Sequence, residues 1–477
     1  MVRSEPLLFA MVPLAALGYA LYSVWEHNHF LTDFDLAIFD QAVWNYSQFQ
    51  TPTITTIDPP VNMLGDHFSP LLILISPLYW IWSDPRMLLI AQGVLVAASI
   101  VPVFLYSRPR LGRVGAYLLC VGYTVFWGVG AAIGFQFHEL AFTPLLVALC
   151  ILFADRRQWG AFFVSVGLLL MVKENMSVLV VFIGLWLISG REFKFGAITV
   201  AAGAIAYFLI LHVMIPAFSG EEYTHWTYTD LGPDAGSALQ TSLTRPDVPL
   251  GLLVDDSTKR LTLALLFLPF LGLTLCSRLA ILCIPLVGQQ LLSDFPQYWS
   301  TEFHHWLPIV PVLAMGAADG FRNLTSRIGS MDERRVAIAG AVVGAVIVAA
   351  NLTIVARERL AGEGYDYQLT GIPLFAAIRS DFSLSQTSTD VSKQRILDGI
   401  PDDATATVAA PLLPHLSQRR EIYMLGHESP RTEFIAFSPD FLLFPDPSYA
   451  QQWLDRNRIH YRVVDFDGSW RLWKRLE

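Results

Sequence analysis

The segment that decides the fold runs from Glu26 to Pro70 and reads EHNHFLTDFDLAIFDQAVWNYSQFQTPTITTIDPPVNMLGDHFSP. It follows an apolar run at 6–25 and gathers carboxylates and imidazoles, while no Lys or Arg occurs between Arg3 and Arg86. Uncompensated carboxylates beside hydrocarbon are costly, so they usually bind a cation, pair with a substrate or carry protons. We therefore interpret this loop as the working site. Its acidic and imidazole residues are Glu26, Asp33, Asp35, Asp40, Asp58, Asp66, His27, His29 and His67.

The composition is that of an integral membrane protein. Of 477 residues, 53% are hydrophobic and 15% are charged, and the mean hydropathy is +0.46, well away from the averages of soluble domains. The four cysteines lie in apolar segments, so no disulfide framework is expected. The run at 6–25 is long enough to span and lacks a small-residue cleavage site, and it is therefore interpreted as the first helix rather than a signal peptide.

Eleven apolar runs approach the ~20 residues that a bilayer core demands. A further piece at 71–82 is broken by Pro77 and is too short to cross, so we expect it to lie at the interface and to close the first loop, 26–85. The predicted spans are 6–25, 86–106, 112–131, 139–154, 159–172, 175–190, 196–216, 261–275, 278–292, 305–321 and 335–356.

Positive charge supports this count. With the N-terminus inside, the inner loops carry thirteen Lys and Arg residues up to residue 356, and the outer loops carry five. Basic residues favour the cytoplasmic side, so this asymmetry predicts a cytoplasmic N-terminus and an extracytoplasmic C-terminus in the plasma membrane. The outer five are Arg86, Lys173, Arg245, Lys259 and Arg260.

From about residue 357 the composition becomes that of a soluble domain. A helix near 370–380 and a Ser/Thr/Gln linker at 382–392 precede strands at 404–410, 420–425 and 441–444, a helix at 449–456 and a hairpin that turns at Asp467-Gly468. We expect two domains: a transmembrane domain, 1–356, and a small extracytoplasmic α/β domain, 357–477. The second contains no glycine-rich phosphate loop and no metal-ligand spacing.

Residues 33–44 predict a short amphipathic helix in the first loop. Asp33 or Asp35 caps this helix in the simpler interpretation. In the functional one, an unpaired Asp removes a proton from an acceptor hydroxyl as that hydroxyl attacks an activated sugar. Asp40 is the alternative base, and Gln41 would position hydroxyls.

The end of the loop, Gly65 to Pro70, contains Asp66 and His67. The pair is either a structural hydrogen bond or part of a binding site. In the second interpretation His67 binds phosphate oxygen, or Asp35, Asp66 and His67 together hold a divalent cation, Mg²⁺ or Mn²⁺.

Charged residues also interrupt apolar segments at the outer ends of later helices. Such groups tend to face a protein interior and mark a site. Pairing of Lys173 and Glu174 with each other or with Glu139 is the structural alternative; in the functional one, Lys173 meets a lipid phosphate. The candidates for substrate contact at these positions are His138, Glu139, Lys173, Glu174, Arg260 and His305.

Several of these motifs resemble an uncharacterised family of prokaryotic multi-pass proteins, the domain of unknown function 2079, which is similar to the GT-C glycosyltransferases. The resemblance spans most of the chain. Lys173-Glu174-Asn175 stands where the family often has Lys-Glu-Asp, and His138-Glu139 lacks an intervening Pro. The motifs that carry the resemblance are Phe34 to Trp44, Gly65 to Pro70, Phe137 to Leu140, Lys173 to Asn175 and Leu413 to Tyr423.

The resemblance implies an α-helical polytopic enzyme that transfers sugar from a polyprenyl-phosphate-linked donor to a glycan, lipid or protein acceptor on the outer membrane face. Asp35 or Asp33 would be the catalytic carboxylate, by analogy of fold. Lys173, His67 and His138, with Arg260 or His305, would neutralise the leaving phosphate. Membrane lipids are expected partners, and nucleic acid is not.

Two other classes of function compete with this prediction. A transporter or flippase for lipid-linked saccharides needs polar residues at mid-bilayer depth and broken helices in both halves, whereas this chain concentrates its polar groups on one side. A non-catalytic scaffold for envelope glycan assembly would instead recruit partners through the C-terminal domain.

Overall fold

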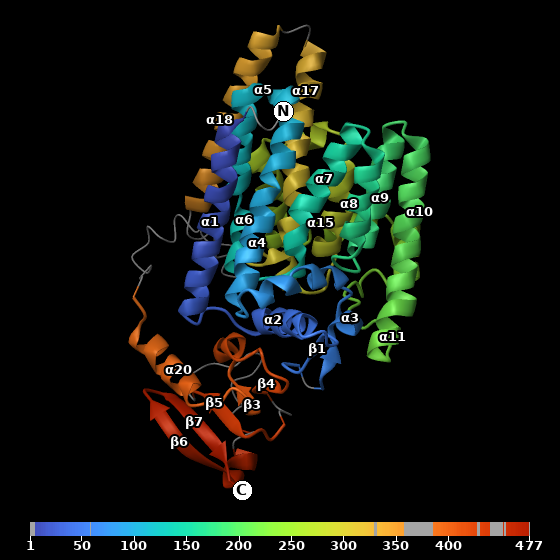
Figure 1. Cartoon of the computed structure of the whole chain (residues 1–477). Coiled ribbons are helices and arrows are strands. Elements are labelled where there is room, and N and C mark those ends of the chain that lie inside the picture. Colours follow the sequence, from blue (N-terminus) through green and yellow to red (C-terminus); the bar gives the residue numbers. More distant parts are fainter. Residues whose placement is uncertain are drawn as a thin grey trace.

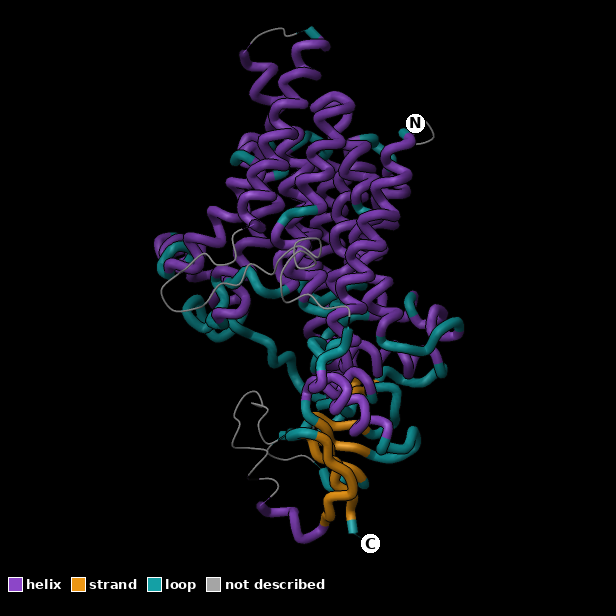
Figure 2. The backbone as a smooth tube through the Cα atoms, turned by 90° about the vertical axis from the view of Figure 1, so that its left-hand side faces the viewer, coloured by secondary structure: helices purple, strands orange, loops and turns teal. Residues whose placement is uncertain are grey.

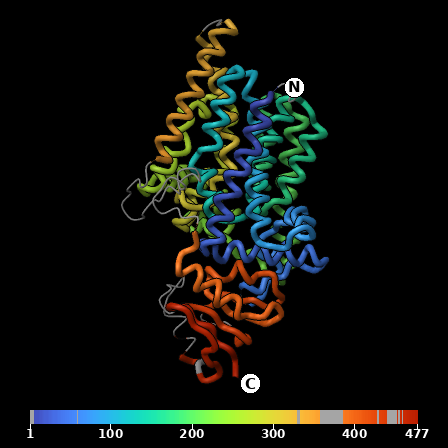
Figure 3. Tube along the Cα trace, turned by 60° about the vertical axis from the view of Figure 1, so that its left-hand side comes forward, coloured from blue at the N-terminus to red at the C-terminus, as the bar shows by residue number. Residues whose placement is uncertain are grey.

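The computed structural model describes residues 5–57, 59–328, 332–356, 385–426, 430–438, 452 and 455–476. A bundle of helices forms one part, and a small sheet domain lies beyond one end of it (Figures 1 and 3). The bundle is built from α1 (Pro6–Asn28), α4 (Arg86–Ala98), α5 (Ile100–Thr124), α6 (Trp127–Gly134), α7 (Thr143–Asp155), α8 (Trp159–Leu170), α9 (Met176–Ser189), α10 (Phe193–Leu209), α11 (Ile215–Ser219), α14 (Ser257–Phe267), α15 (Ala280–Leu291), α17 (Val310–Ile328) and α18 (Glu333–Ala356).

Every predicted span contains helix, but the helices differ in length. Among the described residues, four are long and apolar enough to cross a membrane: Pro6–Asn28, Arg86–Thr124, Phe193–Ser219 and Glu333–Ala356. Others are shorter; α8 has 12 residues, about 18 Å at 1.5 Å per residue. The helical membrane fold is confirmed, while the number of crossings and the side on which each terminus lies stay predictions.

The longest of these helices folds back on itself. Gly112 has φ +75° inside α5, a conformation that a residue with a side chain rarely adopts. Contacts with α1 show the reversal. Arg86 contacts Asn28 at the end of α1, and Arg108 contacts Glu5 at its start. Past Gly112 the order is reversed, because Arg113 contacts Glu5 and the carbonyl of Ile133 accepts from Ser23. The predicted spans 86–106 and 112–131 are therefore two antiparallel passes joined at Gly112.

Small residues let the last helix pack against the second of these passes. A Cβ on Gly340 of α18 would lie 2.1 Å from the carbonyl oxygen of Leu111, so only glycine allows this approach.

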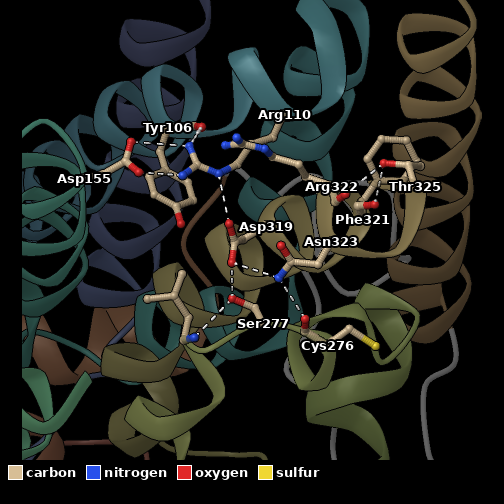
Figure 4. A network of polar contacts seen from close by, with 11 residues as sticks. Tyr106, Arg110, Asp155, Cys276, Ser277, Asp319, Phe321, Arg322, Asn323 and Thr325 are labelled. Carbon is tan, nitrogen blue, oxygen red and sulfur yellow. Dashed lines mark hydrogen bonds and ion pairs between the residues drawn. The ribbon is translucent and has the colours of Figure 1, made fainter. Parts of the chain in front are cut away.

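A network of charges closes the end of the bundle that contains Glu5 (Figure 4). Arg110 contacts Asp155 at 2.6 Å and Asp319 at 3.3 Å, and it donates to the carbonyl of Tyr106. Asp319 in turn accepts from Ser277 at 2.6 Å. We call these five residues the Arg110 network. Within it, no buried side-chain nitrogen or oxygen lacks a partner.

The opposite end of the bundle carries the first loop. Its main helix, α2, lies across this end between the bundle and the sheet domain (Figure 1). The piece predicted to lie at the interface forms two 3₁₀ helices, Pro70–Leu74 and Ser76–Trp80, with Ile81 81% exposed. The loop elements are α2 (Phe34–Ser47), β1 (Thr53–Ile54), β2 (Val61–Asn62) and α3 (Met63–Asp66).

Short helices cover this same end between α11 and α17. Asp234 and Asp256 cap the helices that follow them by accepting from Ser237 and Thr258. These elements are α12 (Ala235–Thr244), α13 (Asp247–Leu252), α16 (Pro296–Trp299) and the 3₁₀ turn His304–Ile309, and the 3₁₀ turn Glu139–Phe142 precedes α7. Two further 3₁₀ turns, Leu268–Phe270 and Leu273–Cys276, join α14 to α15, and the carbonyl of Cys276 accepts from Asn323 beside the Arg110 network. A π-helical turn, Ile210–Met214, joins α10 to α11.

The C-terminal part is a five-stranded sheet in the order β4-β3-β5-β7-β6, seen edge-on in Figure 2. β3 is parallel to β4 and β5, and β7 is antiparallel to β5 and β6. α20 (Ser388–Asp398) begins with a capping box between Thr387 and Asp390. The other elements are β3 (Ala406–Val408), β4 (Ile422–Met424), β5 (Phe434–Phe437), β6 (Tyr461–Asp467), β7 (Trp470–Arg475) and the 3₁₀ turns Ala410–His415 and Arg458–His460.

Predictions for this part had mixed outcomes. The strands at 404–410 and 420–425 and the hairpin at Asp467-Gly468 match β3, β4 and the β6–β7 turn. The strand β5 was not among the predicted strands. The linker at 382–392 overlaps the start of α20, so its second half is helical. The helix near 370–380 and the strand at 441–444 lie outside the described residues, as does much of the helix at 449–456.

Candidate active site at the α2 end

A glutamine from a distant loop caps α2, so neither predicted aspartate does. Asp33 occupies the N-cap position without a capping hydrogen bond from its side chain. Gln136 accepts from the N–H of Leu36 at 3.0 Å and donates to Asp33 at 2.7 Å. Burial raises the pKa of Asp33, and the negative charge of Asp35 raises it further. The hydrogen bond from Gln136 lowers this pKa but does not outweigh the other two effects. Asp35 is thereby left without a capping role.

Asp35 faces an imidazole. Its carboxylate lies 3.5 Å from Nε2 of His138, and its side chain is 32% exposed, so an incoming hydroxyl has access to it. Burial by itself would raise the pKa of Asp35, but the hydrogen bond and charge of His138 outweigh it, helped by the charges of Lys173 and His67. The net effect lowers the pKa, which keeps Asp35 ionised and able to accept a proton at neutral pH.

His138 is held from behind by other rings and by an amide. Its backbone N–H donates to Gln92 at 3.2 Å, and its ring stacks on His304 at 3.4 Å between centroids. Nδ1 of each imidazole is buried without a hydrogen-bond partner among the described residues. Buried polar atoms are rarely left unsatisfied in a region with only a structural role.

Two ion pairs lie beside this group. Lys173 contacts Glu139 at 2.6 Å, and His67 contacts Glu174 at 3.0 Å. Burial by itself would lower the pKa of His67 and raise that of Glu174. Their mutual attraction outweighs burial, raising the pKa of His67 and lowering that of Glu174 to about 2. The predicted pairing of Lys173 with Glu139 is observed, whereas Glu174 pairs with His67.

A cavity of about 390 Å³ adjoins this group, and Asp35, His138 and Glu139 are not among its lining residues. His67, Lys173, Glu174 and His305 line it together with Asn175, whose Oδ1 is buried without a partner among the described residues. The rest of the wall is largely apolar and comes from membrane-level helices, with Val178 and Phe182 of α9, Leu211 of the π turn, and Ile284 and Pro285 of α15. The cavity thus combines an ionic end with a hydrocarbon-like wall.

A group of possible metal ligands lies at the rim. One ligand atom from each of Asp66, His67 and His225 falls within 4.8 Å of the others, and His225 contacts Asp66 at 2.9 Å. Two imidazoles with one carboxylate suit Mn²⁺ or Zn²⁺ better than Mg²⁺, which prefers oxygen ligands. Asp35 is not part of this group; His225 takes the place that the prediction gave it.

Other predicted residues lie elsewhere. Asp40 is fully buried and accepts from Tyr79, Ser417 and Gln418 at 2.5, 2.6 and 3.2 Å. Gln41 bonds to Thr55 and to the carbonyl of Arg419.

Both side chains therefore fasten α2 to the C-terminal domain, and neither lines the cavity. Arg260 donates to the carbonyls of Val254 and Asp255 in its own loop and does not line the cavity either. Asp58 lies outside the described residues.

The sequence analysis did not single out Gln92 or Gln136 as functional. Gln92 was the more detectable of the two, because a carboxamide inside an apolar span usually faces a partner. It bonds to the carbonyls of Ala132 and Gln136 and so fixes the turn that presents His138. The importance of Gln136 rests on a positive φ of 75° and on a contact across a hundred residues, which sequence spacing does not reveal.

The fold has relatives of known structure. The profile of the family described as "Predicted membrane protein (DUF2079)" matches residues 26–474. ArnT from Cupriavidus metallidurans, solved with undecaprenyl phosphate, superposes with a TM-score of 0.55 at 11% identity over 98% of both chains. Its apo structure gives the same TM-score over 99% of this chain and 98% of that one.

The oligosaccharyltransferase of Archaeoglobus fulgidus, tethered to an acceptor peptide, superposes with a lower TM-score of 0.44. The sequence matches no curated protein. The chain shares the fold of ArnT.

Proposed function

This chain belongs to the DUF2079 family of predicted membrane proteins, and we propose that it is a GT-C-type glycosyltransferase that uses a polyprenyl-phosphate-linked sugar. The observation that carries the proposal is the cavity, in which an apolar wall ends in Lys173, His67 and His305. A lipid-linked donor has the same division, with a hydrocarbon tail joined to a charged phosphate. The fold shared with ArnT, solved with undecaprenyl phosphate, agrees with such a donor.

Asp35 would act as the base. The acceptor oxygen attacks the anomeric carbon of the donor, its proton passes to Asp35, and the bond between that carbon and the phosphate oxygen breaks. A single displacement of this kind inverts the anomeric configuration. His138 would hold the Asp35 carboxylate in the orientation that accepts the proton.

The leaving phosphate would be stabilised by cations at the polar end of the cavity. Lys173 is the main candidate, because burial opposes its charge but Glu139 and Glu174 outweigh burial and raise its pKa, which keeps it protonated. Such preorganised charge is usually a large contribution to catalysis. Arg260 is too far along its loop to line the cavity, and we assign it no part.

A divalent cation held by Asp66, His67 and His225 would add positive charge beside the same phosphate. The three ligand atoms are close enough for one ion, and the polarisation of a phosphate oxygen is the chemistry such an ion supplies. In this proposal the reaction takes place at the outer face of the plasma membrane. The acceptor is a glycan, lipid or protein that approaches from the α2 end.

Replacement of Asp35 tests the proposal. Full-length protein in lipid nanodiscs would receive undecaprenyl-phosphate-linked hexoses and pentoses together with a lipid extract as acceptor, and mass spectrometry would follow transfer. We expect Asp35→Asn to reduce transfer roughly 100- to 10,000-fold while binding of undecaprenyl phosphate is retained. Asp247→Asn, an exposed aspartate in an ion pair with Arg245, is the matched control. Full transfer by folded Asp35→Asn would contradict the proposal.

A further inference from the structure

A second cavity lies between the bundle and the sheet domain. Its volume is about 460 Å³, within the range of small-molecule sites. We call it the joint cavity. Its walls come from the end of α1, the start of α4, α20 and the segment that follows β3, and its lining residues are His27, Asn28, Asp84, Pro85, Arg86, Gln386, Gln394, Leu397, Asp398, Ile400, Asp402, His415, Leu416 and Arg419.

The motif Leu413 to Tyr423, for which the sequence analysis found no function, builds one wall of this cavity. His415 stacks on His27 with ring centroids 4.1 Å apart, and its Nε2 is buried without a partner among the described residues. Arg419 is only 8% exposed and donates to the carbonyls of Pro401 and Ala404. The residues between them, Ser417 and Gln418, hold Asp40. The motif therefore joins the domains and shapes the cavity at once.

The lining chemistry is polar but close to balanced in charge. Carboxylates of Asp84, Asp398 and Asp402 face the guanidinium groups of Arg86 and Arg419, with three carboxamides among them. Asp84 and Arg86 already neutralise each other at 2.5 Å. A lipid tail finds little apolar wall here, and a strongly charged ligand finds no excess of the opposite charge. Donors and acceptors that alternate around a balanced cavity suit a neutral ligand rich in hydroxyl groups.

We propose that the joint cavity binds a neutral saccharide, the glycan part of the acceptor. This assignment rests on the proposed function only in naming the ligand as the acceptor. The chain takes seven residues from Asn28 in the joint cavity to Asp35, so the two Cα atoms lie at most about 25 Å apart. An oligosaccharide of several sugar units seated in the joint cavity is long enough to span that distance.

Binding is measured separately from transfer. Full-length protein in nanodiscs is titrated with a fluorescent neutral hexose trisaccharide, a uronic acid trisaccharide and inorganic phosphate. We expect the neutral trisaccharide to bind, and Asp398→Ala and Asp402→Ala each to weaken it about tenfold or more, as the loss of a hydrogen bond to a charged group does. Both residues are exposed, so the fold should persist. Asp403→Ala, at the next position outside the cavity, should bind like the unchanged protein.

Three results would overturn the assignment: no binding of the neutral trisaccharide, binding unaffected by both variants, or tighter binding of the uronate or of phosphate. The outcome is separable from that of the proposed function. Saccharide binding without any sugar transfer would support the saccharide site in the joint cavity and contradict the proposed transferase activity. Sugar transfer that is unchanged in Asp398→Ala and Asp402→Ala would contradict the acceptor site in the joint cavity and support the proposed transferase activity.

Discussion

The Arg110 network and the Asp35 cluster are both groups of buried and partly buried charged side chains, at opposite ends of α1. In the network, no buried side-chain nitrogen or oxygen lacks a partner, Figure 4 shows the contacts of Arg110 and Asp319, and neither cavity includes any of its residues. In the cluster around Asp35, buried atoms of His138, His304 and Asn175 lack partners among the described residues, and Asn175 lines a cavity. The contrast teaches that buried charge alone marks no site; unsatisfied polar atoms beside a cavity do.

The largest expected effect lies in the Arg110 network. Arg110→Met should lower the free energy of unfolding by about 3 kcal/mol, because Asp155 and Asp319, which are both partly exposed, lose their hydrogen bonds from a shared cation. Thermal unfolding in detergent measures it. Arg322→Met, an exposed arginine at the same end, should change stability by less than about 0.5 kcal/mol. Equal stability of the two variants would break the comparison.

Asp40 lies at the same end of the bundle as Asp35, but its carboxylate accepts hydrogen bonds from three donors, so it should behave as a structural group like the Arg110 network. Burial raises its pKa to about 6 against the bonds from Ser417, Tyr79 and Gln418. The folded state therefore binds the proton more tightly, and stability should fall by roughly 3 kcal/mol as pH rises from about 4 to about 6, then level off.

Asp40→Asn should remove this fall while undecaprenyl phosphate still binds, as expected of a structural group. Unfolding followed across the same pH range measures it. An unchanged pH profile, or lost lipid binding in the folded variant, would place Asp40 with the Asp35 cluster instead.

Lys173 is expected to have a structural role, through its ion pair with Glu139, and a binding role, through the lipid phosphate, and two variants separate these roles. Lys173→Met should weaken binding of undecaprenyl phosphate roughly tenfold to a hundredfold and also destabilise the protein, because Glu139 is left buried and unpaired. Adding Glu139→Gln should restore stability but not binding. Lys194→Met, at an exposed position, is the control for loss of charge. Binding restored in the double variant would show that Lys173 is only structural.

The smallest effect is expected at His138. Because His138 lowers the pKa of Asp35, His138→Gln should raise that pKa and move the acid limb of the pH–rate profile to higher pH. At neutral pH Asp35 stays ionised, so the rate should fall by at most about tenfold. A rate that falls without any movement of the acid limb would mean that His138 contacts substrate rather than Asp35.

Much of this arrangement was predictable from the sequence. Hydropathy located the helical segments, and Pro77 with the short run at 71–82 correctly excluded a helix long enough to cross there. The first loop was recognised as the site of concentrated carboxylates, and helical spacing gave α2. The family resemblance was confirmed by the match over residues 26–474, and the helical membrane fold with a small C-terminal domain by the superposition on ArnT.

Spacing did not distinguish Asp35 from Asp40. Both lie on α2, five residues apart, and which partner each one meets depends on segments far away in the chain. Asp40 meets Ser417 across 377 residues, and Asp35 meets a turn that Gln92 and Gln136 hold. The predicted cation site changed for the same reason, because His225 reaches Asp66 from a loop 159 residues later.

The sequence by itself determined the membrane fold, the small C-terminal domain and the loop in which the chemistry is concentrated. These follow from local hydropathy and charge, since each apolar run must leave water wherever its neighbours lie. Only the tertiary structure decided which carboxylate stands free beside an imidazole, which one fastens two domains, and where the cavities open. Those roles depend on burial and on hydrogen-bond partners, and both are set by contacts between residues that are distant in the chain.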